Sequence, residues 1–224
     1  AVMFGMFFGL AQYLQFVMGH SPLNTSLRVI PFAVGMVAIA PRGPRLVERF
    51  GAGKVMGSGL LLAASGCIVM SLLSASSPYL HVLAGIIMLS SGMAMTFPTA
   101  TTAIVGSLPL DKAGVASAVN DTTREVGAAV GIALLGTLLS AGYRRALGDT
   151  LDSLPLPAEA LKASRDSVGA ALHVARSAPG SAGEAIAMAA RSAFASGYSL
   201  TMIAGAAIMA TIGVILIVRF PDSD

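Results

Sequence analysis

Apolar residues form six long runs along the chain, separated by shorter polar stretches. A helix needs about 20 residues to cross the hydrocarbon core of a bilayer, and runs of this length with few charges are typical of transmembrane helices. The pattern therefore predicts an all-α membrane protein, a six-transmembrane-helix bundle. The expected spans are residues 1–18, 22–40, 55–73, 79–105, 113–139 and 194–218.

The stretch between the last two runs has a different character. Residues 140–192 mix charged side chains with alanine, and prolines interrupt them, so this stretch is too polar to span. Its composition predicts one or two short helices that lie on the membrane surface. The chain thus divides into transmembrane helices one to five (1–139), an extracytoplasmic loop with short helices (140–192), and the last span with a short cytoplasmic tail (193–224).

Basic residues predict the orientation of the spans. The loop at 41–54 carries one acid, Glu48, and four basic residues: Arg42, Arg45, Arg49 and Lys54. Short loops rich in Arg and Lys stay in the cytoplasm, whereas long loops cross the membrane regardless of their charge. We therefore expect this loop and both ends of the chain to be cytoplasmic.

Prolines and a helix cap mark local features of the spans. Ser21 is suited to cap a helix that begins at Pro22, where proline is favoured. Pro31 and Pro98 lie inside the second and fourth runs and predict kinks, because proline removes a backbone hydrogen bond. A unit that only packs against other helices has no need of such kinks.

Composition excludes several classes of protein. Of the 224 residues 55% are hydrophobic and 11% are charged, and the mean hydropathy is +0.79. Soluble domains carry about 25% charged residues. The net charge of +3 is small, and topology accounts for the basic residues, so no nucleic-acid partner is expected. The chain opens inside an apolar run without an initiator Met, which predicts a longer protein whose N-terminal part is missing.

Sequence motifs of enzymes and metal sites are absent. The chain has no HExxH, GxxxxGK[ST] or GxSxG pattern and no paired Cys/His set. Its three histidines are scattered, and its single cysteine excludes a disulfide within the chain. We therefore expect neither an enzyme nor a bound cofactor or metal.

The fifth run carries four polar or charged residues in its first half: Asn120, Asp121, Arg124 and Glu125. One charge at the centre of a transmembrane helix costs about 2.5–3.5 kcal/mol, so the group should be hidden from lipid. Helical spacing places Asn120 and Asp121 within reach of Arg124. Three interpretations of Arg124 stay open: it lines or gates a transport pathway, it latches two helices, or it reaches to the headgroups. Gly127 and Gly131 should face a neighbouring helix.

Three more polar residues are candidates for lining a cavity. Gln12 and Gln15 lie near the end of the first run, and Arg28 lies about two turns into the second. The alternative for the two glutamines is a wet position at the membrane interface, where Tyr13 would serve as an aromatic anchor.

Three stretches of the chain carry a family resemblance. The first comprises Tyr13 to Gln15 with Gly19 to Leu23, Arg28 and Pro31; the second comprises Pro41, Gly43, Leu46, Glu48, Arg49 and Gly51; and the third comprises Gly114, Ser117, Asn120, Arg124, Gly127, Gly131 and Gly136. The second stretch is similar to a degenerate form of a family's basic loop, with Glu48 in place of an Asp. The third stretch is the most specific of the three. In these stretches the chain resembles the C-terminal half of the fourteen-span drug:proton antiporters of the major facilitator superfamily, the EmrB/QacA branch.

The resemblance implies half of a major facilitator fold in the inner (plasma) membrane, in contact with the bilayer and with an N-terminal half. It implies export of hydrophobic or cationic drugs driven by protons, with Asn120, Asp121, Arg124 and Glu125 as coupling candidates. It also implies a cytoplasmic gate in the basic loop, formed by Arg45, Glu48, Arg49 and Gly51. Uptake by the same fold and a membrane packing unit that transports nothing are the alternatives.

Overall fold

The computed structural model describes residues 2–107, 109–151, 157–178 and 181–220, and every regular element in these ranges is a helix. The first half contains α1 (Val2–Gln12), the π-helix η1 (Tyr13–Val17), α2 (Pro22–Ile39), the 3₁₀ turn η2 (Ala40–Arg42), α3 (Gly43–Phe50), α4 (Ala52–Ser71) and α5 (Tyr79–Gly106). The second half contains the 3₁₀ turn η3 (Leu110–Lys112), α6 (Ala113–Leu151), α7 (Ala158–Asp166), α8 (Val168–Ser177) and α9 (Ser181–Arg219).

Each predicted span overlaps a helical segment of the structure. Five helical segments are long and apolar enough to cross a membrane: Pro22–Phe50, Ala52–Ser71, Tyr79–Gly106, Ala113–Gly148 and Ser181–Arg219. A shorter apolar segment, Val2–Val17, corresponds to the first predicted span. The predicted all-α membrane fold is therefore confirmed, and the arrangement is consistent with half of a major facilitator bundle.

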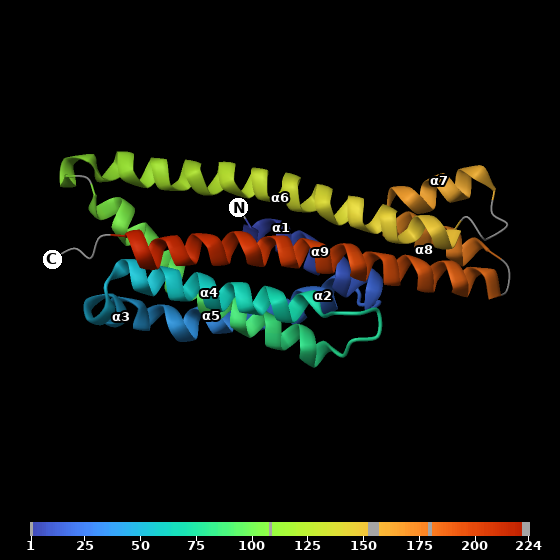
Figure 1. Ribbon diagram of the computed structural model, residues 1–224, viewed down its shortest axis with the longest axis horizontal. Helices are drawn as coiled ribbons and strands as arrows, with labels where there is room; N and C mark the ends of the chain where they lie inside the picture. The colour runs from blue at the N-terminus through green and yellow to red at the C-terminus, as the bar shows by residue number, and fades with distance from the viewer. Residues whose placement is uncertain (1, 108, 152–156, 179–180, 221–224) are drawn as a thin grey trace.

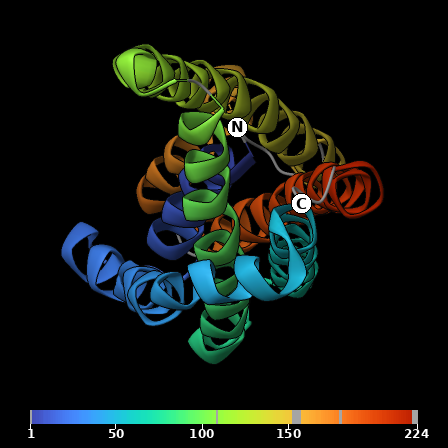
Figure 2. The same cartoon turned by 90° about the vertical axis from the view of Figure 1, so that its left-hand side faces the viewer.

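The bundle is built around α4, which packs between α5 and α9. Helix α9 also packs along α6, α6 along α1, and α2 along α5. In the end-on view of Figure 2, α2 and α6 lie at the outside with α5 between them. Small residues allow the closest crossings, because a Cβ on Gly59 of α4 would lie 2.7 Å from the Gly92 carbonyl oxygen of α5.

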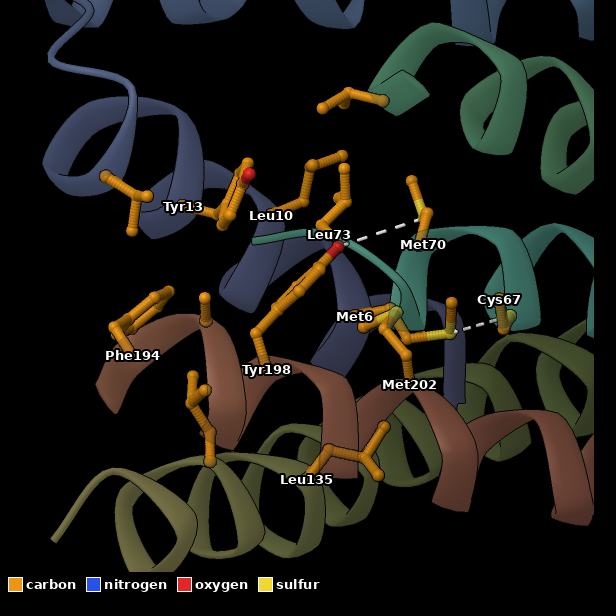
Figure 3. Packing of buried hydrophobic residues seen from close by; sticks show 14 of the residues in the cluster. Met6, Leu10, Tyr13, Cys67, Met70, Leu73, Leu135, Phe194, Tyr198 and Met202 are labelled. Carbon is orange, nitrogen blue, oxygen red and sulfur yellow. Dashed lines mark hydrogen bonds between the residues drawn. The ribbon is translucent and has the colours of Figure 1, made fainter. Parts of the chain in front are cut away.

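Sulfur-containing and aromatic side chains fill the centre of the bundle (Figure 3). The rings of Tyr13 and Tyr198 stack with centroids 5.4 Å apart. The Tyr198 hydroxyl donates to the Met70 sulfur at 3.8 Å, and the Tyr13 hydroxyl donates to the Ser74 carbonyl at 2.7 Å. The π-helix η1 is therefore tied to the turn between α4 and α5.

Helices α6 and α9 are longer than the apolar runs predict. Each has 39 residues, so each is roughly 58 Å long at 1.5 Å per residue, about twice the hydrocarbon thickness. The expected boundaries at 139 and 193 fall inside continuous helices, because alanine and arginine favour helix as well as apolar residues do. Helices α7 and α8 pack at the projecting ends, as Figure 1 shows. The Tyr143 hydroxyl of α6 donates to the Ser164 carbonyl of α7 at 2.8 Å.

The basic stretch 41–54 is mostly helical rather than an open loop. Helix α3 follows α2 with only the turn η2 between them, and the Arg42 guanidinium donates to the Ala38 carbonyl. Gly51 ends α3 with a φ of +83°, a conformation that glycine adopts without strain. At the other end of α2 the Ser21 hydroxyl accepts from the Asn24 amide at 3.3 Å, which confirms the predicted cap.

Candidate functional site

The polar cluster lies on the first half of α6. Asp121, Arg124 and Glu125 are exposed, whereas Asn120 is buried. The Asn120 amide donates to the Asp121 carboxylate at 3.5 Å, the limit for a hydrogen bond. The side of α6 that carries the three exposed charges is therefore not covered by the described helices.

Arg124 meets an aromatic ring instead of a polar partner. Its guanidinium carbon lies 5.6 Å from the centroid of Phe97, which precedes Pro98 in α5. No hydrogen bond joins Arg124 to a residue that the structure describes, so its pairing with Asn120 or Asp121 stays a prediction. Helix α6 approaches α5 here, and the ring of Phe97 lies within range of the cation.

Of the two α6 glycines that were expected to face another helix, Gly131 does so. Gly131 is buried, and its carbonyl oxygen lies 2.5 Å from the position that a Cβ on Gly5 of α1 would take. The side chain of Leu135, one turn further along, is buried in the same crossing. The prediction that Gly131 faces another helix is confirmed, and that helix is α1.

Arg28 forms a second contact between a cation and an aromatic ring. Its guanidinium carbon lies 4.6 Å from the centroid of Tyr79, the first residue of α5, and the Tyr79 hydroxyl donates to the Arg28 carbonyl at 2.7 Å. In the neighbouring turn, burial lowers the pKa of His20, and the positive charge of Arg28 lowers it further. Helix α2 is thereby fastened to the start of α5.

The predicted residues do not gather at one point. Tyr79 and Phe97 lie on the same helix about 27 Å apart along its axis, so the contacts of Arg28 and Arg124 lie toward opposite ends of α5. The predicted cavity residues Gln12 and Gln15 are half-buried, and their side chains make no hydrogen bond to a residue that the structure describes. The sequence pattern does not single out Tyr79 and Phe97, because only the packing shows which ring meets which cation.

The predicted gate residues lie on α3, away from the α6 cluster. Arg45, Glu48 and Arg49 are exposed, and the Arg49 guanidinium carbon lies 5.1 Å from the ring centroid of Phe50. The carboxylate-bearing side of α3 faces the last turns of α5, because Glu48 and Thr102 line one cavity. Gly51 provides the break between α3 and α4.

The outer helices present apolar stripes. On α2 the exposed residues recur every three or four positions: Leu23, Leu27, Ile30, Val34 and Val37. On α6 one side of the helix carries the exposed residues Val115, Val119, Val126 and Val130. Such stripes suit either lipid tails or a facing helix.

Comparison with known proteins identifies the family. Residues 1–132, more than half of the chain, match the Major Facilitator Superfamily. The chain belongs to the Major Facilitator Superfamily. This is a family of membrane transporters rather than of enzymes, and the helices long enough to cross a membrane agree with it.

Curated relatives of this superfamily member include resistance and efflux proteins. The multidrug efflux pump LfrA of Mycolicibacterium smegmatis is 33% identical over 76% of this chain and 33% of its own length. The methyl viologen resistance protein SmvA of Salmonella typhimurium is 30% identical over 75% of this chain and 33% of its own. The tetracenomycin C resistance and export protein of Streptomyces glaucescens is 33% identical over 61% of this chain and 25% of its own length. The chain spans about a third of the length of the relatives it matches.

Proposed function

We propose that this chain is the C-terminal half of a drug exporter of the fourteen-span EmrB/QacA branch, located in the inner (plasma) membrane. The relatives are named for multidrug efflux, drug resistance and export, which supports drugs as the substrate and export as the direction. Their length, about three times the matched part, supports a partner half elsewhere in the same protein. Hydrophobic or cationic compounds are the proposed substrates, and protons drive the exchange.

The observation that carries the proposal is the position of Arg124. The residue lies about 16 Å along α6 from Ala113, roughly half the hydrocarbon thickness. There it is exposed on the described bundle and touches Phe97 beside the proline of α5. An uncovered cation at this depth needs a water-filled cavity or a partner half, and both belong to a transport pathway.

Proton coupling is proposed for the acids beside Arg124. Asp121 and Glu125 are exposed on the same part of α6. An arginine nearby favours the charged form of a carboxylate, so a change in the distance between them would bind or release a proton. Alternating access would supply that change, because rocking of the two halves opens and closes the face between them.

The test replaces Arg124 in the complete transporter. Arg124→Ala should abolish drug resistance, whereas Arg124→Lys should retain part of it, because lysine keeps the charge but loses the planar guanidinium. The matched control is Arg144→Ala, which removes an exposed arginine from the projecting part of the same helix. The amount of folded transporter in the membrane is measured for each variant.

Each outcome has a distinct meaning. Full resistance with Arg124→Ala contradicts a role in transport. Loss of resistance together with loss of folded protein supports a helix latch instead. Uptake rather than export is detected in inverted vesicles, where an exporter accumulates a fluorescent drug on energisation and an importer does not. Proton coupling fails if dissipation of the pH gradient leaves this accumulation unchanged.

A further inference from the structure

A cavity of about 600 Å³ opens at the end of the bundle that carries α3. This end lies on the left in Figure 1, where α3 and the last turn of α9 are found. Three helices contribute its walls, namely α3, the start of α4 and the last two turns of α5 beyond Pro98. Phe220, which follows α9, closes one side. Cavities of this volume are of the size that holds drug-sized molecules.

The walls of this cavity are mainly apolar, with a few polar groups. Pro44, Val47, Pro98, Ala103 and Phe220 supply the apolar surface, and the hydroxyls of Thr99 and Thr102 lie among them. Thr99 already donates its hydroxyl to the Met95 carbonyl at 2.8 Å, so that hydroxyl offers a ligand only its lone pairs. Such a lining binds an apolar molecule and orients it through a small number of polar contacts.

The charge in the lining has one sign. Glu48 is the only ionisable side chain among the described residues that line the cavity. Among the neighbouring cations, Arg49 lies over the Phe50 ring and Arg42 donates to the Ala38 carbonyl. Lys54 lines an adjacent hollow together with Glu48, but it is not part of the lining of this cavity. A carboxylate at the rim of an apolar cavity favours a cation over an anion of the same shape.

We infer that this cavity binds an organic cation with large apolar groups, held by the apolar walls and paired with the Glu48 carboxylate. The inference deepens the proposed export function, on which its biological meaning rests, by giving the cationic substrate a binding site at the α3 end of the bundle. Occupancy would also place the ligand between α5 and α3, the helix that carries the predicted gate residues.

The probe is a pair of ions of the same shape and opposite charge, tetraphenylphosphonium and tetraphenylborate. Thr102→Cys places an exposed thiol in the cavity of the complete protein, and modification by N-ethylmaleimide is read by mass spectrometry of the peptide that contains it. The native Cys67 is fully buried and does not interfere. Ser117→Cys, exposed on α6 and outside the cavity, is the matched control.

Tetraphenylphosphonium should protect Cys at position 102 but not at position 117, and tetraphenylborate should protect neither. Glu48→Gln should raise the phosphonium concentration needed for half protection by up to about fivefold, the upper end of the range for an ion pair near solvent. Asp111→Asn, at the same end but outside the lining, should leave it unchanged. If Thr102→Cys does not fold, Gly106→Cys replaces it, since a Cβ there meets nothing within 4 Å.

Three results would overturn the inference: no protection at position 102, equal protection by both ions, or equal protection at position 117. The outcome is independent of transport, because labelling needs neither turnover nor protons. Protection without drug resistance would leave the site standing and remove the export function. Drug resistance without protection would leave the export function standing and remove the proposed binding site.

Discussion

The crossing of α1 and α6 gives a prediction whose magnitude follows from the packing. In Gly5→Ala the added Cβ would lie 2.5 Å from the Gly131 carbonyl oxygen and 2.8 Å from the Leu135 Cβ. The nearer of these two atoms, the Gly131 carbonyl oxygen, belongs to the backbone and cannot rotate away as a side chain can. The two helices must therefore separate by nearly 1 Å to restore ordinary contact, and their side chains lose packing along the crossing.

Overpacking of this kind costs about 1–3 kcal/mol, and alanine returns up to about 1 kcal/mol through its better helix propensity. We expect Gly5→Ala to destabilise the protein by about 1–2 kcal/mol. Thermal unfolding of the complete protein in detergent, followed by the fraction that remains monodisperse, measures the difference. Gly131→Leu, on the other side of the crossing, should cost at least as much.

The matched control is Gly136→Ala on α6, the helix that faces α1 in this crossing. Its Cβ would meet only the Phe8 Cε1 at 3.9 Å, so it gains helix propensity without a clash and should be neutral or stabilising. Equal stability of Gly5→Ala and Gly136→Ala would refute the reasoning, because it would show that α1 and α6 do not cross as closely as the structure has them.

Further predictions concern Arg124, the gate and the topology. Phe97→Ala should lower resistance in the complete transporter, while Phe97→Tyr should retain it, because tyrosine keeps the ring beneath the cation; equal loss in both would show that the ring is not the important feature. Arg49→Ala should reduce turnover more than drug binding, since it alters the balance between states, and unchanged transport would leave the basic stretch as a topology signal alone. In whole cells an impermeant thiol reagent should label Lys162→Cys and spare Arg45→Cys, and the opposite pattern would invert the topology.

The sequence determined the features that depend on local composition. Transfer into lipid is a property of each residue, so apolar runs revealed the spans without any knowledge of their neighbours. Helix caps depend on residues three apart, so Ser21 was found as well. The side of α6 that carries Gly131 could be predicted from the sequence, because close helix crossings need small residues such as glycine at helical spacing.

The tertiary structure alone decided which side chains meet. Arg28 and Arg124 were recognised as unusual within apolar runs, but their partners, Tyr79 and Phe97, lie 51 and 27 positions away and are ordinary residues of another helix. The extension of α6 to Leu151 was hidden because a hydropathy pattern reports burial in lipid, whereas alanine and arginine continue a helix in water as well. The cavity beside Glu48 exists only because α3 packs against the end of α5, and the position of one helix against another depends on the fit of all their side chains together.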